Sequence, residues 1–318
     1  MLLHLFAITL AAATIPEPAE YARAASYPKE VADRIIEGIY KEREKTAEWM
    51  STSPTSHFTT VSRRDFEGKK TLTVGRTKDN DLVIDDPVVE EHHLRVTVKG
   101  DSFQVEAVDP LARFVISTDQ IRQATVPPGM IRISRFYLRL SHQNYPAIIV
   151  FDRKMNGLER FRGLKHYRVD LNYCFALPLT ENPAPDTVVI LSTRGNQRRA
   201  LRIGWFHFMV GDTKCRLEAV RLLEPGIDEK DVAVFFQDAT NGKDTYPLGR
   251  YVDALPLPGG TGKYLLDFNR AYNPACAYSP HYNCPIPPKE NVLKVAIPVG
   301  EQDSHYADHE TEVKVGAK

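Results

Sequence analysis

The sequence predicts a mainly β protein in which two antiparallel β-domains, each a sandwich or barrel, follow a single N-terminal α-helix. Three observations support this fold class. Between residues 69 and 268, short runs rich in β-branched and aromatic residues alternate with turn-forming residues. In this region no strand pattern alternates with a helix pattern, which excludes a parallel α/β sheet. The chain has 318 residues, enough for about two domains with a core each.

The first thirteen residues form an uncharged apolar run that ends in three alanines, 11–13. The run is too short to cross a membrane as a helix, which takes about 20 residues. Small residues at its end are typical of a signal-peptidase site, so we expect residues 1–13 to be a cleaved signal peptide and the protein to be secreted or periplasmic. A signal peptide usually begins with Lys or Arg, and this run has neither. The alternative to a signal peptide is therefore a buried N-terminal strand or helix. No later segment resembles a membrane span.

Residues 14–56 are expected to hold a linker and one helix. Apolar residues recur at spacings of three and four from Val31 to Ile39, which gives one apolar stripe. Ser26 is suited to cap a helix over about residues 27–50, and the Ser-, Thr- and Pro-rich segment 51–56 ends it. We expect this helix to pack across a β-domain rather than to bind a partner.

Residues 57–142 are expected to form the first β-domain, a sandwich. Strand patterns cover residues 71–74, 82–84, 94–98 and 103–108, and the last two flank a hairpin-like turn at 99–101. Residues 130–140 alternate apolar side chains with arginines, which predicts a strand with a basic outer edge.

The second antiparallel β-domain is expected over residues 143–300. Its predicted strands cover residues 147–151, 166–179, 187–192, 200–208, 214–220, 232–237 and 263–268. The polar residues 301–318 are expected to be a flexible tail.

The charge balance argues against a polyanion-binding protein. Lys and Arg together number 41, as do Asp and Glu, so no net field favours nucleic acid or an anionic membrane. Two common hydrolase patterns, Gly-x-Ser-x-Gly and His-Glu-x-x-His, are absent from the sequence. These observations favour a non-enzymatic protein without a cofactor.

Three short motifs lie close together in the first predicted domain: Val74–Arg76, Asn80–Ile84 and Val89–His93. In this order they resemble the forkhead-associated (FHA) family, whose pattern is Gly-Arg, an Asn-Asp-hydrophobic strand and Ser-Arg-x-His. In that family the Arg and the Ser bind the phosphate of a phosphothreonine. The resemblance therefore implies an FHA-like sandwich in which Arg76 is the candidate phosphate ligand.

The sequence departs from the FHA pattern at the site itself. Glu90 stands at the position of the Ser and Glu91 at that of the following Arg, and residues 109–113 replace the family's later Asn-Gly loop. Two carboxylates beside a dianionic phosphate lower affinity through like-charge repulsion. We therefore expect the domain to be degenerate, with its phosphopeptide site lost.

The C-terminal half carries longer motifs: residues 236–246, Leu266–Pro274 with the nearby cysteines, and Pro287–Asn291. Together they resemble the domain-of-unknown-function 1684 family over roughly residues 150–300. Members of this family are mainly bacterial and often exported, sometimes as lipoproteins, although this chain has no lipobox cysteine. The resemblance implies an architecture and no particular reaction.

Four cysteines are present, and export would make an even count a disulfide set. Cys276 and Cys284 lie eight residues apart across a turn-rich segment, and we predict a disulfide between them. For Cys174 and Cys215, a second disulfide and two buried free thiols both remain open. The spacing is wider than the tight Cys-x2–4-Cys of zinc sites, so no metal is expected.

Polar side chains crowd onto the end of the last predicted strand and the loop after it. The candidate ligand-binding residues are Asp267, Asn269, Arg270, Tyr272 and Asn273. A small polar or anionic ligand would suit the guanidinium of Arg270 best. Alternatively, these side chains satisfy the backbone of a non-repetitive loop.

Three functions follow from these patterns. The leading hypothesis is an exported, non-enzymatic binding protein whose partner is an unknown small polar or anionic ligand or an envelope protein, and not a nucleic acid. The first alternative is a secreted hydrolase that uses Asp238, Asp267 and His281. The second alternative is a phosphothreonine-dependent adaptor that acts through Arg76.

Overall fold

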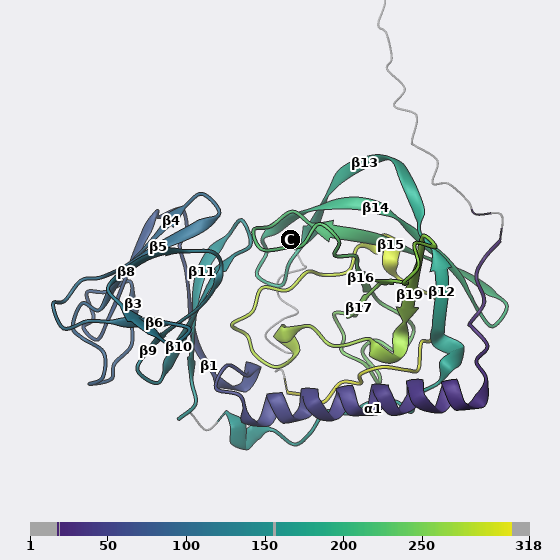
Figure 1. The fold of residues 1–318 in the computed structure, drawn as a ribbon, viewed down its shortest axis with the longest axis horizontal. Coiled ribbons are helices and arrows are strands. Elements are labelled where there is room, and N and C mark those ends of the chain that lie inside the picture. Colours follow the sequence, from purple (N-terminus) through teal and green to yellow (C-terminus); the bar gives the residue numbers. More distant parts are fainter. Residues whose placement is uncertain (1–17, 19, 155–156, 307–318) are drawn as a thin grey trace, which may run out of the picture.

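The computed structural model describes residue 18 and residues 20–154 and 157–306, so the predicted signal peptide lies outside the described part. The fold is mainly β, with several antiparallel sheets and one N-terminal α-helix, which confirms the predicted class. Figure 1 shows the first β-domain at one end of the molecule and the second at the other, with α1 running along the second domain.

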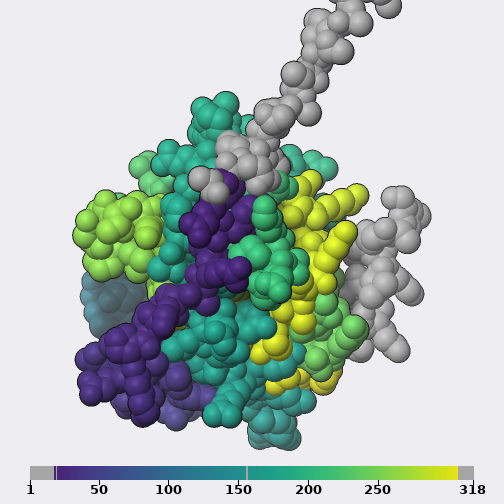
Figure 2. All heavy atoms as spheres, turned by 90° about the vertical axis from the view of Figure 1, so that its right-hand side faces the viewer, coloured from purple at the N-terminus to yellow at the C-terminus, as the bar shows by residue number. Residues whose placement is uncertain are grey.

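Helix α1 spans Lys29–Thr52 and turns one side, including Ile39 and Met50, into the protein. It begins two residues later than predicted because Pro28, in an extended conformation, occupies the N-cap position, and no side chain caps it. Arg43 on this helix donates hydrogen bonds to backbone carbonyls of the second domain. The expected packing of the helix across a β-domain is therefore present, and Figure 2 shows the purple N-terminal segment lying on that surface.

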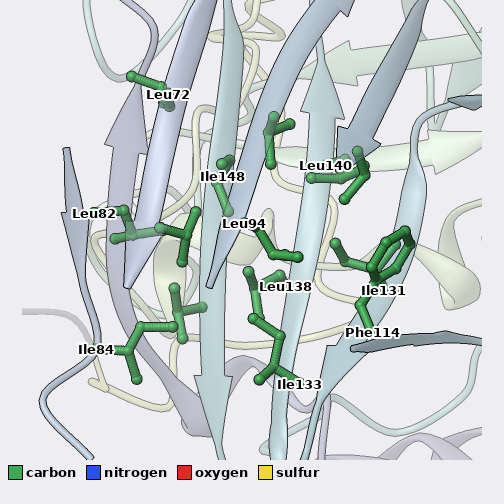
Figure 3. Packing of buried hydrophobic residues seen from close by; sticks show 14 of the residues in the cluster. Leu72, Leu82, Ile84, Leu94, Phe114, Ile131, Ile133, Leu138, Leu140 and Ile148 are labelled. Carbon is green, nitrogen blue, oxygen red and sulfur yellow. The ribbon is translucent and has the colours of Figure 1, made fainter. Parts of the chain in front are cut away.

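Two sheets form the first domain. One has the order β1-β11-β10-β9-β6-β7 and the other β3-β2-β4-β5-β8, and every pair is antiparallel except β2–β3. Their strands are β1 (Thr60–Asp65), β2 (Thr71–Gly75), β3 (Leu82–Val83), β4 (Leu94–Lys99), β5 (Ser102–Ala107), β6 (Phe114–Ile116), β7 (Asp119–Ile121), β8 (Gln123–Val126), β9 (Gly129–Ile133), β10 (Phe136–His142) and β11 (Pro146–Asp152). Figure 3 shows their apolar side chains, such as Leu72, Leu94 and Leu138, packed together in the core of this domain.

The border between the domains differs from the sequence prediction. Strand β11, assigned above to the second domain, pairs with β1 and β10 in the first. Ile148 and Val150 face the core of the first domain, whereas Ile149 and Phe151 pack in a second cluster with Met50 of α1. A strand buried on both faces reads as a continuous apolar run, so its pattern does not tell which sheet it joins.

The second domain combines a five-stranded sheet, β13-β14-β15-β16-β17, with a three-stranded sheet, β12-β19-β18. Their strands are β12 (Cys174–Pro178), β13 (Thr180–Leu191), β14 (Gln197–Val210), β15 (Thr213–Leu222), β16 (Ala233–Phe236), β17 (Arg250–Asp253), β18 (Leu255–Pro256) and β19 (Lys263–Asp267). Short 3-10 helices connect the elements: η1 (His57–Thr59), η2 (Leu158–Arg160), η3 (Leu171–Tyr173), η4 (Phe268–Arg270), η5 (Ala275–Ala277) and η6 (Lys289–Asn291).

The segment 301–306, predicted as the start of a flexible tail, is instead packed. Glu301 and Asp303 are buried, and the ring of Tyr306 packs edge-on against Phe58 at 4.7 Å. The prediction missed this because the segment is polar in sequence, while its polar groups are buried by making specific hydrogen bonds. Among these, Glu301 accepts from the backbone N–H of Asn273 at 2.9 Å.

Candidate functional site

Three loops meet at one end of the first domain and form what we call the loop face: residues 76–81, 84–93 and 108–113. They follow β2, β3 and β5. Backbone hydrogen bonds join the first loop to the second, from Arg76 N to Glu90 O at 3.0 Å. A third loop is joined in the same way, from Asp109 N to His92 O at 3.1 Å. The backbones of the three loops are thus fixed relative to one another, and they position the side chains of the loop face.

Gly75 and Asn80 hold the first two loops together. The side-chain amide of Asn80 donates to the carbonyls of Thr77 and Glu91. A Cβ at position 75 would lie 2.1 Å from the carbonyl oxygen of Glu91, so only glycine fits at this close approach. These two positions of the FHA-like motif therefore serve the loop frame.

His93 clamps the second loop to the third. Its Nδ1 accepts from the backbone N–H of Glu90 at 3.0 Å, which assigns the ring proton to Nε2, and Nε2 donates to the carbonyl of Arg113 at 2.8 Å. Burial lowers the pKa of His93, which keeps the ring in this neutral form at neutral pH. His93 is consequently a positioning residue and not an exposed ligand.

Arg76 is displayed on the loop face. Its side chain is 38% exposed, and its Nε donates to the carbonyl of Val89 at 3.3 Å. One Nη lies 3.5 Å from a carboxylate oxygen of Glu91, which is itself 63% exposed. A long, solvated ion pair of this kind contributes about 1 kcal/mol or less, so it holds Arg76 only weakly. The guanidinium remains available to an anionic partner.

Other charges surround Arg76 with both signs. Lys78 on the same loop is exposed, as are Glu91 and Arg113 on the two neighbouring loops. His92 lies 3.6 Å from a carboxylate oxygen of Asp79. Positive and negative charges are mixed on the loop face, so its electrostatic potential does not have one sign. A partner would therefore be recognised by individual contacts.

The second candidate site, at the end of β19, is mostly closed. Asp267 and Asn269 are buried, and Asp267 accepts from both the backbone and the side-chain N–H groups of Asn269. Arg270 pairs with Asp267 and, at 2.9 Å, with Glu42 of α1. This network satisfies the loop and joins it to the helix.

Tyr272 and Asn273 complete the predicted set. The ring of Tyr272 is partly exposed, and its hydroxyl donates to Asp253 at 3.4 Å. Asn273 is buried and donates to the carbonyl of Gln302 at 2.9 Å. The structure thus brings the five predicted residues together, three of them buried, and their role in ligand binding stays a prediction.

The three residues proposed for a hydrolase, Asp238, Asp267 and His281, each interact with a different arginine. Asp238 pairs with Arg250 at 2.8 Å, both side chains being fully buried, while Asp267 pairs with Arg270. The backbone carbonyl of His281 accepts a hydrogen bond from Arg63 of the first domain, 3.2 Å away. Each carboxylate therefore already has a cationic partner. The Asp238–Arg250 pair was missed from the sequence, because a spacing of twelve residues across an irregular loop carries no recognisable pattern.

The cysteines are all buried. Cys276 and Cys284 lie close together, with the backbone N–H of Cys276 directed at the sulfur of Cys284 over 3.4 Å, and the predicted disulfide remains a prediction. Cys174 and Cys215 are separate free thiols: the sulfur of Cys174 lies 3.6 Å from the hydroxyl of Tyr27, and that of Cys215 lies 3.7 Å from a backbone carbonyl. Burial raises the pKa of Cys174 to about 11, so this thiol is uncharged.

The described residues contain no group of three His, Cys, Asp or Glu side chains arranged to hold a metal ion. Within the same ranges, no helix combines the length and the apolar character needed to span a membrane.

Comparison with protein families gives two matches. Residues 159–302 match the family described as protein of unknown function (DUF1684), and residues 72–134 match the FHA domain. The second match contains the whole loop face, and the first contains the loop after β19. No curated protein matches the chain.

Solved structures similar to the chain include an uncharacterized protein from Haloarcula marismortui. It is 31% identical, over 46% of this chain and 80% of that one, with a TM-score of 0.38. Mycobacterium tuberculosis EmbR, in complex with a low-affinity phosphopeptide, is 16% identical over 39% of this chain and 32% of its own, with a TM-score of 0.20.

A further similar structure comes from work on phosphothreonine-dependent FHA domain interactions. It is 16% identical, over 30% of this chain and all of that one, with a TM-score of 0.21. The family matches place the chain: it belongs to the DUF1684 family through its C-terminal half, residues 159–302, with an FHA domain before it at residues 72–134.

Proposed function

We propose that the chain is an adaptor that binds a phosphothreonine-containing protein through the loop face of its FHA domain, with Arg76 contacting the phosphate. The observation that carries this proposal is the environment of Arg76: the side chain is partly exposed, stands at the FHA position for phosphate binding, and is held by one hydrogen bond to the carbonyl of Val89 and one long ion pair with Glu91. The frame residues Gly75, Asn80 and His93 also keep the family pattern and make the contacts that fix the loops. This favours the adaptor over the binding protein that led the sequence-based hypotheses.

The two glutamates set the expected strength of binding. A phosphate that contacts Arg76 displaces Glu91, at a cost of about 1 kcal/mol or less for so exposed a pair. Glu90 stays near the phosphate and opposes it by like-charge repulsion. We therefore expect weak binding whose affinity rises when these carboxylates are removed.

Isothermal titration of the full chain with a peptide mixture centred on phosphothreonine tests the proposal. The same mixture without phosphate is the control ligand, and Arg95→Ala is the control variant, because Arg95 lies on β4 outside the loop face. We expect saturable binding of the phosphorylated mixture only, lost in Arg76→Ala and kept in Arg95→Ala. Equal binding of both mixtures, or full affinity in folded Arg76→Ala, would overturn it.

Export of the chain is proposed separately, on the apolar run at residues 1–13 and the close approach of Cys276 to Cys284. Mass spectrometry of the protein from its native host, purified without reductant, tests both points. We expect a mature N-terminus just after the run and two fewer free thiols than the four cysteines would give. An intact N-terminus with four thiols would contradict export.

A further inference from the structure

A cavity of about 340 Å³ lies between helix α1 and the loop after β19, in the second domain. Four of the five residues predicted to bind a ligand line it: Asn269, Arg270, Tyr272 and Asn273. Helix α1 lines the opposite wall, with Arg43, Trp49 and Met50 among its lining residues. The volume is at the lower end of the range of small-molecule sites, about 300–1,000 Å³.

Two residues that line this cavity carry a buried polar atom without a hydrogen-bond partner. They are Nε of Arg43 and Oδ1 of Asn273. A buried polar group without a partner is unfavourable, because it has lost its hydrogen bonds to water. Asn273 is only 5% exposed, and its amide nitrogen is already engaged with the carbonyl of Gln302. One donor and one acceptor beside the cavity are thus left without a partner in the protein.

Arg43 also differs from its neighbour Arg270 in charge balance. Arg270 has two carboxylate partners, whereas Arg43 donates only to the backbone carbonyls of Tyr167 and Asn269, at 2.9 and 3.1 Å. Within the described residues, no carboxylate oxygen lies within ion-pair distance of Arg43. Burial lowers the pKa of its guanidinium, and the more distant charges of Asp267 and Glu301 offset this only in part. A half-buried cation without a direct ion-pair partner favours an anionic ligand.

The remaining walls restrict the size and charge of that ligand. The rings of His57 and Tyr278 are stacked at 5.6 Å, and Trp49 packs edge-on against His57 at 5.1 Å. Such aromatic walls suit a flat apolar body. Glu301 adds a buried carboxyl group fixed by Tyr278 and Asn273, which disfavours a second negative charge on the ligand.

We propose that this cavity binds a small aromatic monocarboxylic acid, with the carboxylate at Arg43, the ring against Trp49 and His57, and a hydroxyl or amino donor at Asn273. The site lies in the second domain and is independent of the loop face and of phosphopeptide binding. It gives the DUF1684 domain a ligand of its own.

The test uses 4-hydroxyphenylacetate as the probe, titrated into the full chain by calorimetry and by NMR. The neutral 4-hydroxyphenylacetamide has the same shape without the charge. We expect saturable binding of the acid, at least about tenfold weaker binding of the amide, and a similar loss in Arg43→Gln, since a charge-assisted hydrogen bond contributes about 1.5–3 kcal/mol. Arg34→Gln, on the exposed side of the same helix, should bind like the wild type.

A second variant covers the case in which Arg43→Gln does not fold. Trp49 is partly exposed, so Trp49→Ala should fold and yet weaken binding of the acid. Chemical-shift changes should lie in α1 and residues 269–278. The proposal fails if the acid does not saturate, if acid and amide bind equally, or if the shift changes lie elsewhere.

Discussion

The loop face and the loop after β19 are both rich in polar side chains, but they use them in opposite ways. On the loop face, buried Asn80 and His93 fix the backbone, and the charged residues Arg76 and Glu91 project into solvent. In the loop after β19, the charged residues are paired with each other: buried Asp267 forms an ion pair with partly exposed Arg270. The difference shows that charged side chains stay accessible to a partner where uncharged groups fix the backbone, whereas in the loop after β19 the charged side chains are used within the protein.

The largest expected effect comes from breaking a buried ion pair of the second domain. Asp238→Asn leaves the fully buried guanidinium of Arg250 without its counter-charge, and we expect a loss of about 3–5 kcal/mol in the free energy of unfolding. Urea denaturation measures it. Glu37→Gln, which removes an exposed pair with Lys41 on α1, is the control and should leave the unfolding midpoint unchanged. A similar midpoint for Asp238→Asn would mean that the pair is not buried as described.

The next effect is a pH dependence of stability. Burial raises the pKa of Glu301 from its usual 4.5 to about 7, so the folded state holds its proton more tightly than the unfolded state. Stability from this group is therefore full below pH 4.5 and is lost as the pH rises through 7, by about 3 kcal/mol in all.

Glu301→Gln isolates this contribution, since Gln does not titrate. Burial lowers the pKa of His57 and His166 to about 4, which acts in the opposite direction below pH 6.5 in both proteins. We expect the stability of the variant, relative to the wild type, to rise between pH 5 and 8 in urea denaturation. A constant difference would show that Glu301 titrates normally.

A gain of binding is expected on the loop face. Glu90→Ser with Glu91→Arg restores the FHA pattern and removes two like charges from the phosphate position, so we expect about tenfold tighter binding of the phosphothreonine peptide mixture. Calorimetric titration measures the change. Adding Arg76→Ala to this variant should remove the gain, and a gain that persists would place the phosphate elsewhere.

The smallest effect is on stability at Arg76. Because its ion pair with Glu91 is long and exposed, Arg76→Ala should change the free energy of unfolding by about 1 kcal/mol or less while it abolishes peptide binding. His93→Ala should behave differently. It removes the hydrogen bonds that join two loops, so we expect it to lower both the free energy of unfolding and the affinity for the peptide. Equal losses of stability in Arg76→Ala and His93→Ala would contradict the distinction between residues that fix the loops and residues that face a partner.

Local patterns in the sequence predicted the elements that depend on local contacts. The apolar stripe around Ile39 predicted α1, and the turn at residues 99–101 predicted the β4–β5 hairpin. Gly75, Arg76 and His93 identified the FHA domain because a close backbone approach and a loop clamp constrain residue type at fixed spacing.

Contacts between distant segments could not be predicted in the same way. The assignment of β11 failed because both faces of this strand are buried, one in each cluster. Glu301 was placed in a tail because its partners, Tyr278 and Asn273, lie more than twenty residues away. Likewise, the network of the loop after β19 depends on Glu42 of α1, which no local pattern links to Arg270.

The central claim is that partner recognition lies on the loop face. Its most direct test is the NMR spectrum of isotope-labelled full chain during titration with the phosphothreonine peptide mixture. We predict that the amide shifts move at residues 76–93 and 108–113, and that those of 267–278 stay in place. Shifts that move at 267–278 and leave Arg76 unaffected would contradict the claim.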